Sequence, residues 1–339
     1  MTGEGTIAEV LAGSARWALV RGDGLAVLRD LPPACIDMLA TDPPYSSGGF
    51  TRGDRMGSTE SKYVQTTVVA RGLTVRPDFA GDNRDQRAFA MWCTLWLGEA
   101  LQKAKPGAAI ACFTDWRQLP TTTDVVQAGG WIWRGIVPWD KGTSHRPTEG
   151  RFSAQCEYIV WGSAGAMPFE RDAPTQRGYL AHPHEVDRRD AIDASMLALA
   201  RDLVADTCGD DRPMGHQLAR LVLERDAFDP SASVIRATNV RHDKHHMTGK
   251  PVPLMERIVE LCERGGVVLD LFAGSASTGV ACLRQGRRFI GVELTEENYA
   301  IGLERMRAEE RGLSPAAARA GQVSLFDMPD LPVVPHEAP

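Results

Sequence analysis

Short apolar runs alternate along most of the chain with segments in which apolar residues recur every three or four positions. The short runs are typical of buried strands and occur at 17–20, 35–40, 108–113, 131–137, 157–161, 267–271 and 289–293. The helical spacing occurs at 25–31, 88–105, 118–128, 253–263, 280–285 and 296–310. Strands that alternate with helices form βαβ units. The pattern therefore predicts one doubly wound α/β domain with a mainly parallel sheet, and residues 1–16 are expected to cover its surface.

Three segments depart from this alternation. Residues 46–85 are polar and glycine-rich and directly follow a predicted strand, so we interpret them as a lid over a functional site. Residues 163–245 fit the α/β rhythm poorly and are interpreted as an inserted subdomain. Residues 313–339 are rich in Ala and Pro and are expected to form a disordered tail. The α/β domain would then consist of two halves, residues 1–162 and residues 246–312.

Composition limits the environment and the partners of the chain. Its 339 residues are 43% hydrophobic and 24% charged, an ordinary globular balance, and the formal net charge is −6. A nucleic-acid partner would therefore need a local basic face. The seven cysteines form no Cys-x-x-Cys pair, which indicates reduced thiols and a cytoplasmic protein. We expect neither a signal peptide nor a membrane span.

The first candidate site is Thr41-Asp42-Pro43-Pro44-Tyr45, which follows the strand predicted over 35–40. The prolines end the strand, and open α/β sheets bind ligands at the carboxyl ends of their strands. The carboxylate of Asp42 and the carbonyl of Pro43 can accept hydrogen bonds from an exocyclic amino group, while Tyr45 can stack on the ring that carries it. A strand-ending turn capped by the Asp side chain would explain the same residues without any chemistry.

The second candidate site lies in residues 267–293, where a strand, a turn of small residues, a helix and another strand follow one another. Such a turn lets a ligand approach the backbone closely. Glu293 lies 19 positions after Gly274, a spacing that suits a carboxylate accepting hydrogen bonds from both hydroxyls of a ribose. The pattern is typical of nucleotide sites, and a purely structural βαβ turn would have the same appearance.

A metal site is not predicted. His242, His245 and His246 lie together in the most basic segment, residues 236–246. No Cys or Glu in that segment completes a set of ligands.

Three motifs, in this order, resemble those of the β-class, the circularly permuted amino-methyltransferases of DNA. They are the Asp-Pro-Pro-Tyr tetrad at 42–45, a His-x-Thr-x-Lys-Pro segment at 246–251 and an Asp-x-Phe-x-Gly-Ser-x-Ser segment at 270–277. The resemblance covers roughly 17–162 and 246–306. It implies a Rossmann-like methyltransferase sheet of about seven strands, with one edge strand antiparallel, and S-adenosylmethionine as the methyl donor.

The resemblance also implies roles for individual residues. Asp42, Pro43, Pro44 and Tyr45 would form the catalytic tetrad around an adenine that is flipped out of the duplex. Around S-adenosylmethionine, Asp23 would contact the adenine of the donor and Glu293 its ribose hydroxyls. Thr248 and Lys250 would contact its methionine end. The full set expected around the donor is Asp23, Asp42, Thr248, Lys250, Asp270, Phe272, Ala273, Gly274, Ser275 and Glu293.

Two residues depart from the family pattern. Gly249 stands where Glu or Gln is usual, and Ala276 replaces a common second glycine. Neither change removes a chemical group that the implied mechanism needs.

Double-stranded DNA is the partner that the resemblance implies, with residues 163–245 as the target-recognition region. Phosphate contacts are expected from two basic residues before that region, Lys141 and Arg146, and from two in the basic segment at its end, Arg241 and Lys244. The recognition sequence, a homodimer and a cognate restriction endonuclease are left open by the sequence.

Adenine N6 is the preferred target because the tetrad begins with Asp, whereas in cytosine N4 enzymes it usually begins with Ser or Thr. Cytosine N4 transfer uses the same chemistry and remains an alternative. An RNA or a protein side-chain amide is another possible substrate, although the family relatives that act on these usually begin the tetrad with Asn. Transfer to cytosine C5 is disfavoured, because it needs a cysteine after a proline and no Pro-Cys occurs. A non-catalytic nucleic-acid-binding relative is a further alternative, against which the intact Asp42 and Glu293 argue. A dinucleotide-dependent oxidoreductase would leave the tetrad unexplained.

Overall fold

A computed structural model describes residues 2–46, 84–141, 150, 152, 155–168 and 249–313. Most of the predicted lid at 46–85, nearly all of the predicted subdomain at 163–245 and the predicted tail at 313–339 fall outside these residues.

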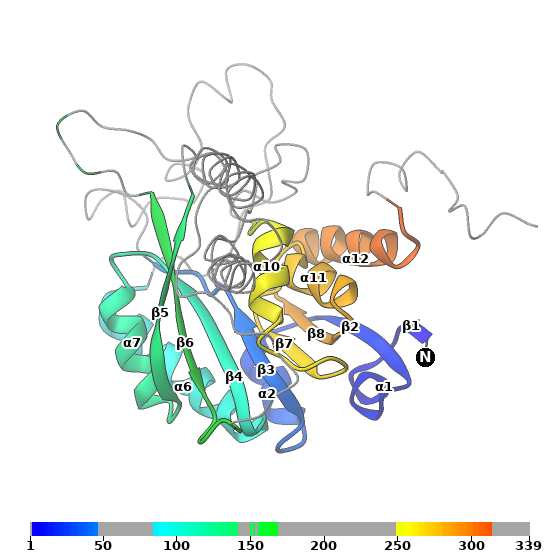
Figure 1. Ribbon diagram of the computed structural model, residues 1–339, viewed down its shortest axis with the longest axis horizontal. Coiled ribbons are helices and arrows are strands. Elements are labelled where there is room, and N and C mark those ends of the chain that lie inside the picture. Colours follow the sequence, from blue (N-terminus) through cyan, green and yellow to red (C-terminus); the bar gives the residue numbers. More distant parts are fainter. Residues whose placement is uncertain are drawn as a thin grey trace, which may run out of the picture.

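One sheet with helices on both faces contains all the described strands (Figure 1). It has eight strands in the order β1-β2-β8-β7-β3-β4-β6-β5. The strands are β1 Thr2–Glu4, β2 Ala15–Arg21, β3 Ile36–Thr41, β4 Ala104–Thr114, β5 Ile132–Asp140, β6 Cys156–Ser163, β7 Val267–Asp270 and β8 Arg288–Glu293. The helices are α1 Ile7–Ala12, α2 Gly24–Asp30, α6 Gln86–Lys103, α7 Leu119–Ala128, α10 Val252–Val259, α11 Ser277–Arg284 and α12 Glu296–Glu310. The doubly wound α/β fold predicted from the sequence is confirmed.

Two details of the sheet differ from the prediction. The antiparallel strand is β6, which pairs with β4 on one side and with β5 on the other. The strand at this edge of the sheet is β5, which runs in the same direction as β4. Residues 1–16 do more than cover a surface, because β1 adds a strand beside β2 and α1 begins with a capping box of Thr6 and Glu9. Elements of three and six residues contain too few apolar positions for a periodicity to show.

Helices cover both faces because the strands bury side chains on both. Along β3, Met38 and Ala40 belong to one core with residues of α10, α11 and α12. Leu39, between them, belongs to the other core with residues of α1, α2, α6 and α7. This alternation explains why the central strands are continuous apolar runs in the sequence.

The chain reverses its direction of winding between β7 and β3, which are neighbours in the sheet. From β7 it passes through α11 to β8 on one side, and from β3 through α6 to β4 on the other. Ligands bind open α/β sheets at such a point, outside the carboxyl ends of the strands. The residues that end these two strands are Thr41 and Asp270.

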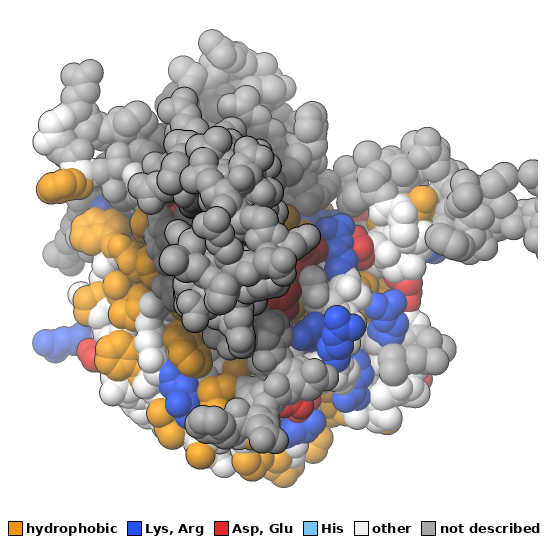
Figure 2. Space-filling model, in the orientation of Figure 1, with side chains coloured by type: hydrophobic (Ala, Val, Ile, Leu, Met, Phe, Trp, Pro, Cys, Tyr) orange, Lys and Arg blue, Asp and Glu red, His pale blue; other side chains and the backbone are white. Residues whose placement is uncertain are grey.

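The edge strand β5 exposes apolar side chains. Ile132 and Trp133, at its amino end, are 46% and 41% exposed. Figure 2 shows apolar side chains gathered on the side of the molecule where Figure 1 places β5, and basic side chains on the side of α10 and α11.

Three further findings concern the described residues. No helix among them is both long and apolar enough to cross a membrane. No group of three or more His, Cys, Asp or Glu within this part of the chain could hold a metal ion. The cysteines that the structure describes are free thiols.

Candidate active site

The tetrad lies at the carboxyl end of β3, as the sequence predicts. The strand ends at the fully buried Thr41, and Pro43 behind it is also buried. The side chain of Asp42 is 25% exposed, so its carboxylate remains reachable. Tyr45 is half-buried and donates its hydroxyl hydrogen to Asp42 Oδ1 over 2.5 Å. A carboxylate and an aromatic ring thus lie together at the edge of the sheet where ligands bind.

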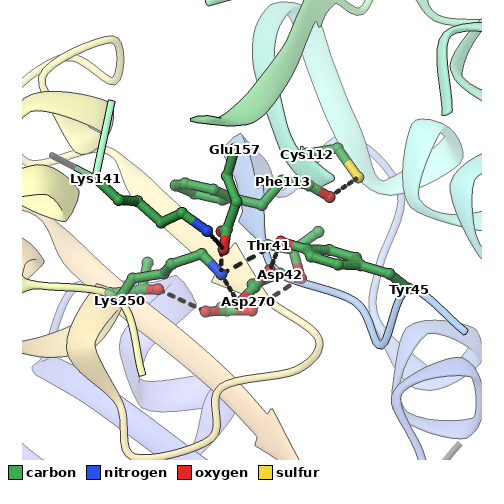
Figure 3. Close-up of polar contacts among 10 residues, drawn as sticks. Thr41, Asp42, Tyr45, Cys112, Phe113, Lys141, Glu157, Lys250 and Asp270 are labelled. Atoms are coloured by element: carbon green, nitrogen blue, oxygen red, sulfur yellow. Dashed lines mark hydrogen bonds and ion pairs between the residues drawn. The ribbon is translucent and has the colours of Figure 1, made fainter. Parts of the chain in front are cut away.

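Lys250 approaches this carboxylate from the segment before α10 (Figure 3). Its Nζ lies 2.5 Å from Asp42 Oδ2 and 3.2 Å from the Tyr45 hydroxyl. It also lies 3.1 Å from Glu157 Oε2. The resemblance implied that Lys250 borders the methionine end of a donor; in this structure its ammonium is directed to the tetrad, and the donor contact stays a prediction.

Glu157, near the start of β6, is a residue that the sequence reasoning missed. Its Oε1 accepts a hydrogen bond of 3.0 Å from Lys141, which follows β5. The only signal in the sequence is an acidic residue inside an apolar strand, and such a residue is more often solvated than functional. Lys141 was expected to contact DNA phosphate; in this structure it lies against Glu157, and the phosphate contact stays a prediction.

Burial and charge act in opposite directions on these groups. Burial raises the pKa of Asp42, and the nearby Lys250 opposes this while Glu157 adds to it. Burial would also raise the pKa of Glu157, but Lys250 and Lys141 outweigh it and lower the pKa to about 2. Burial lowers the pKa of Lys250, and the two carboxylates more than reverse that effect. Glu157 and Lys250 are therefore both charged at neutral pH.

The second candidate site begins at Asp270, whose carboxylate is directed at the protein's own chain. Its Oδ1 accepts hydrogen bonds from Thr41 Oγ1 at 2.9 Å and from the backbone N–H of Phe272 at 3.1 Å. Its Oδ2 accepts from Thr278 Oγ1 at 2.6 Å. Burial raises the pKa of Asp270 to about 6. Asp270 was expected among the donor-binding residues; in this structure it fastens the turn after β7 to the end of β3.

The turn after β7 is held from two further sides. Glu293 Oε2 accepts from the N–H of Gly274 at 2.9 Å, and its Oε1 accepts from Thr295. The buried Arg305 of α12 donates to the carbonyl of Ser275 at 2.8 Å and to its hydroxyl at 3.1 Å. The sequence reasoning also missed Arg305, because nothing in a surface-like helix such as α12 singles out one Arg.

The backbone of this turn adopts the left-handed region at two positions. Gly274 has a φ of 51°, and a side chain added there would meet open space. Ala276, which replaces a common glycine, has a φ of 58° and is fully buried. A non-glycine residue in this region is strained, so the departure seen in the sequence has a local energetic cost.

Phe272 and Asp23 occupy other positions beside the turn. The Phe272 ring lies 5.4 Å from the ring of Trp92 and 5.5 Å from that of Trp96. Asp23 is exposed and caps α2 by accepting from the N–H of Ala26 at 2.9 Å. Their contacts with a donor, like those of the buried Ala273 and Ser275, remain predictions.

Several predicted site residues lie outside the part of the chain that the structure describes. They are Thr248, at the donor site, and Arg146, Arg241 and Lys244, at the DNA surface.

The geometry unites two elements that are far apart in the sequence. A carboxylate and an aromatic ring that suit an amino-bearing base lie at the end of β3, and a turn that suits a nucleotide follows the adjacent β7. The hydrogen bond between Thr41 and Asp270 joins the two directly.

Solved structures agree with this fold. The complex of M1.HpyAVI with SAM has a TM-score of 0.51 at 15% identity, covering 86% of this chain and 98% of that chain. The cytosine-N4-specific PvuII DNA methyltransferase has a TM-score of 0.52 at 16% identity, covering 90% of each chain.

Sequence relatives include YubD of Escherichia coli K12, named as a methylase, which is 24% identical over 300 residues, 88% of this chain and 94% of YubD. The DNA adenine methyltransferase YhdJ of the same organism is 42% identical over 64 residues, 19% of this chain and 22% of YhdJ. The model of the N6/N4 DNA methylase family matches residues 36–304. The chain therefore belongs to the N6/N4 family of DNA methylases.

Proposed function

We propose that this protein is an S-adenosylmethionine-dependent methyltransferase that acts on the exocyclic N6 of a flipped-out adenine in double-stranded DNA. The observation that carries the proposal is the position of Asp42 and Tyr45 at the carboxyl end of β3. The hydrogen bond between Thr41 and Asp270 links this end of β3 to the nucleotide-type turn after β7. Membership in the DNA methylase family supports both the reaction and the substrate class.

The residues around the turn fit the methyl donor. Open space beside Gly274 would admit it, and the carboxylate of Glu293 lies at the end of the next strand, where ribose hydroxyls are held in nucleotide-binding folds. When bound, S-adenosylmethionine supplies an electrophilic methyl group. Asp23, Phe272, Ser275 and Lys250 complete the proposed surroundings of the donor.

The tetrad would act on the target base. Asp42 and the carbonyl of Pro43 would accept hydrogen bonds from the amino group and orient its lone pair, while Tyr45 would stack on the base. In this structure Tyr45 and Lys250 donate to the two oxygens of Asp42, so the amino group must share or replace one of these donors. Asp42 is also the nearest base for the proton that the amino nitrogen loses after transfer.

Cytosine N4 is the second candidate target because the chemistry is the same. The fold likeness to a cytosine-N4-specific enzyme leaves this open, since likeness at 16% identity concerns the fold alone. The tetrad beginning with Asp42 and the local similarity to the adenine methyltransferase YhdJ favour adenine.

The test is to incubate the protein with unmethylated double-stranded DNA and S-adenosylmethionine, digest the DNA and analyse the nucleosides by mass spectrometry. We expect N6-methyladenine. N4-methylcytosine would retain the mechanism and overturn the choice of base. If no methylated base forms although calorimetry shows that the donor binds, the tested DNA is not the substrate. If the donor does not bind either, a non-catalytic nucleic-acid-binding protein is favoured.

A further inference from the structure

Four charged side chains form a row of alternating sign that ends at the tetrad: Lys141, Glu157, Lys250 and Asp42 (Figure 3). The two inner members are the most enclosed, with side chains 9% exposed for Lys250 and 19% for Glu157. Lys141 fixes one oxygen of Glu157 over 3.0 Å. The other oxygen, Oε2, is buried and lies 3.1 Å from Lys250, without the alignment of a hydrogen bond.

We propose that Glu157 is a positioning residue for methyl transfer, which holds Lys250 between two carboxylates so that Asp42 stays available to the amino group of the target base. The inference rests on the proposed function, because it concerns the same site.

The geometry explains why a second carboxylate is needed. Lys250 donates to Asp42 Oδ2 and to the Tyr45 hydroxyl, and its charge also faces Glu157. An incoming amino group that replaces the Tyr45 hydroxyl at Oδ1 would leave Lys250 in place at Oδ2. Without Glu157, the buried ammonium would depend on Asp42 alone, and the carboxylate would become a weaker hydrogen-bond acceptor.

The groups that face Asp42 come from several elements. Lys250 and Glu157 are the charged ones in closest contact, and Tyr45 donates from the tetrad itself. Asp270 on β7 and Cys112 on β4 also interact electrostatically with Asp42. The charge of Glu157 raises the pKa of Asp42 and that of Lys250 lowers it, so we expect the loss of either charge to shift this pKa in the opposite direction.

The test compares the pH dependence of single-turnover methyl transfer in the wild type, Glu157→Gln and Lys250→Met. We expect Glu157→Gln to lower the rate about 10- to 100-fold, with little change in the KM for DNA, as a small misplacement of catalytic groups does. We also expect the acidic limb of the pH–rate profile to move to lower pH in Glu157→Gln and to higher pH in Lys250→Met. Asp140→Asn, a buried carboxylate bonded to Gln155 at the end of β5, is the matched control and should leave the limb in place.

A second readout needs no turnover. The pKa of Asp42, followed by carbon NMR of labelled carboxyl groups, should shift in the same opposite directions in the two variants. Should Glu157→Gln fold poorly, Glu157→Asp keeps the charge and should restore the wild-type limb. An acidic limb and an Asp42 titration that do not differ between Glu157→Gln and Asp140→Asn would overturn the inference. Absence of methyl transfer by the wild type would instead overturn the proposed function, and the NMR titration would still decide the role of Glu157.

An independent observation concerns the turn after β4. Asp115 Oδ1 accepts from the N–H groups of Arg117 and Gln118 at 3.0 and 2.9 Å, which holds the turn in one conformation. Trp116 projects from it with 53% of its surface exposed, and the guanidinium of Arg117 lies 4.9 Å from its ring. Because β4 runs parallel to β3, with Cys112 opposite Thr41, the turn lies at the same edge of the sheet as Asp42.

We infer that Trp116 stacks on an unpaired nucleobase of the DNA substrate, next to the position vacated by the flipped adenine; this inference rests on the proposed function. A flipped base leaves its partner unpaired, and an exposed indole held by a rigid turn offers a flat apolar surface of suitable size for a base to stack on. The cationic Arg117 beside it suits the phosphate backbone.

Trp133 provides a matched control. It is 41% exposed but lies near the amino end of β5, whereas Trp116 follows the carboxyl end of β4. We expect Trp116→Ala to weaken binding of DNA that carries 2-aminopurine opposite the target about 10-fold, within the range for loss of one stacked base, and Trp116→Phe to restore most of it. Trp133→Ala should bind as the wild type does. Equal affinity of the two alanine variants would overturn the inference, and because binding needs no turnover, this result is separate from the fate of the proposed function.

Discussion

Replacing Asp42 by Asn is expected to lower the rate of methyl transfer on the order of 10³-fold, the range found when one catalytic acceptor is removed. The amide presents a hydrogen-bond donor where the amino group of the target needs an acceptor, and it cannot take up a proton. Donor affinity should change far less than the rate, because the substitution leaves the turn after β7 and its hydrogen bond to Glu293 intact. Single-turnover rates and calorimetry with S-adenosylmethionine measure the two effects separately.

Tyr45→Phe is the matched control for this substitution. It keeps the ring that stacks on the base and removes only the hydroxyl that donates to Asp42 Oδ1. Its rate should stay within about 10-fold of the wild type, since no acceptor is lost. An Asp42→Asn variant that methylates at the wild-type rate would show that the carboxylate has no catalytic part.

Replacing Asp270 by Ala is expected to lower the free energy of unfolding by about 3 to 5 kcal/mol, since each buried donor left without a partner costs about 1 to 3 kcal/mol. Three donors lose their acceptor: the hydroxyls of Thr41 and Thr278 and the N–H of Phe272. Urea unfolding of the wild type and the variant at one pH measures the difference. A loss below about 1 kcal/mol would mean that these donors find other partners.

Asp270→Asn separates the charge of this residue from its hydrogen bonds. Burial raises the pKa of Asp270 from 3.8 to about 6, so ionisation is less favourable in the folded protein than in the unfolded chain. The stability contributed by the protonated group is fully present below the unfolded value and is lost as the pH rises through about 6. Between about pH 4 and pH 6 the wild type should therefore lose about 3 kcal/mol relative to Asp270→Asn. Parallel stability curves for the two proteins would contradict this account.

The sequence predicted the α/β core well because its signals are local. Apolar runs and helical spacings located the strands and helices of the sheet, and the prolines of the tetrad marked the end of β3. The exceptions have physical reasons: β1 and α1 are too short for periodicity, and the position of β6 between β4 and β5 depends on pairing between distant strands, which no local pattern records.

The candidate site was predicted only in part, because its key contacts join residues that are distant in the sequence. Asp42 and Tyr45 were found from one motif, but the ion pairs of Glu157 with Lys141 and Lys250 arise from the packing of β5, β6 and the segment before α10. Glu293 and Asp270 were correctly located at strand ends, yet their hydrogen bonds to the protein's own backbone become visible only in three dimensions.

The carboxylate of Asp270 is shared between the residue before Asp42 and the turn proposed to bind the donor, and this has a thermodynamic consequence. A ligand that shifts the turn alters the hydrogen bond to Thr41, and a base that presses on the tetrad alters it from the other end. If occupancy of one site changes affinity at the other, the change must be reciprocal: the factor by which the donor tightens DNA binding equals the factor by which DNA tightens donor binding. We expect any such cooperativity to act through the hydrogen bond between Thr41 and Asp270.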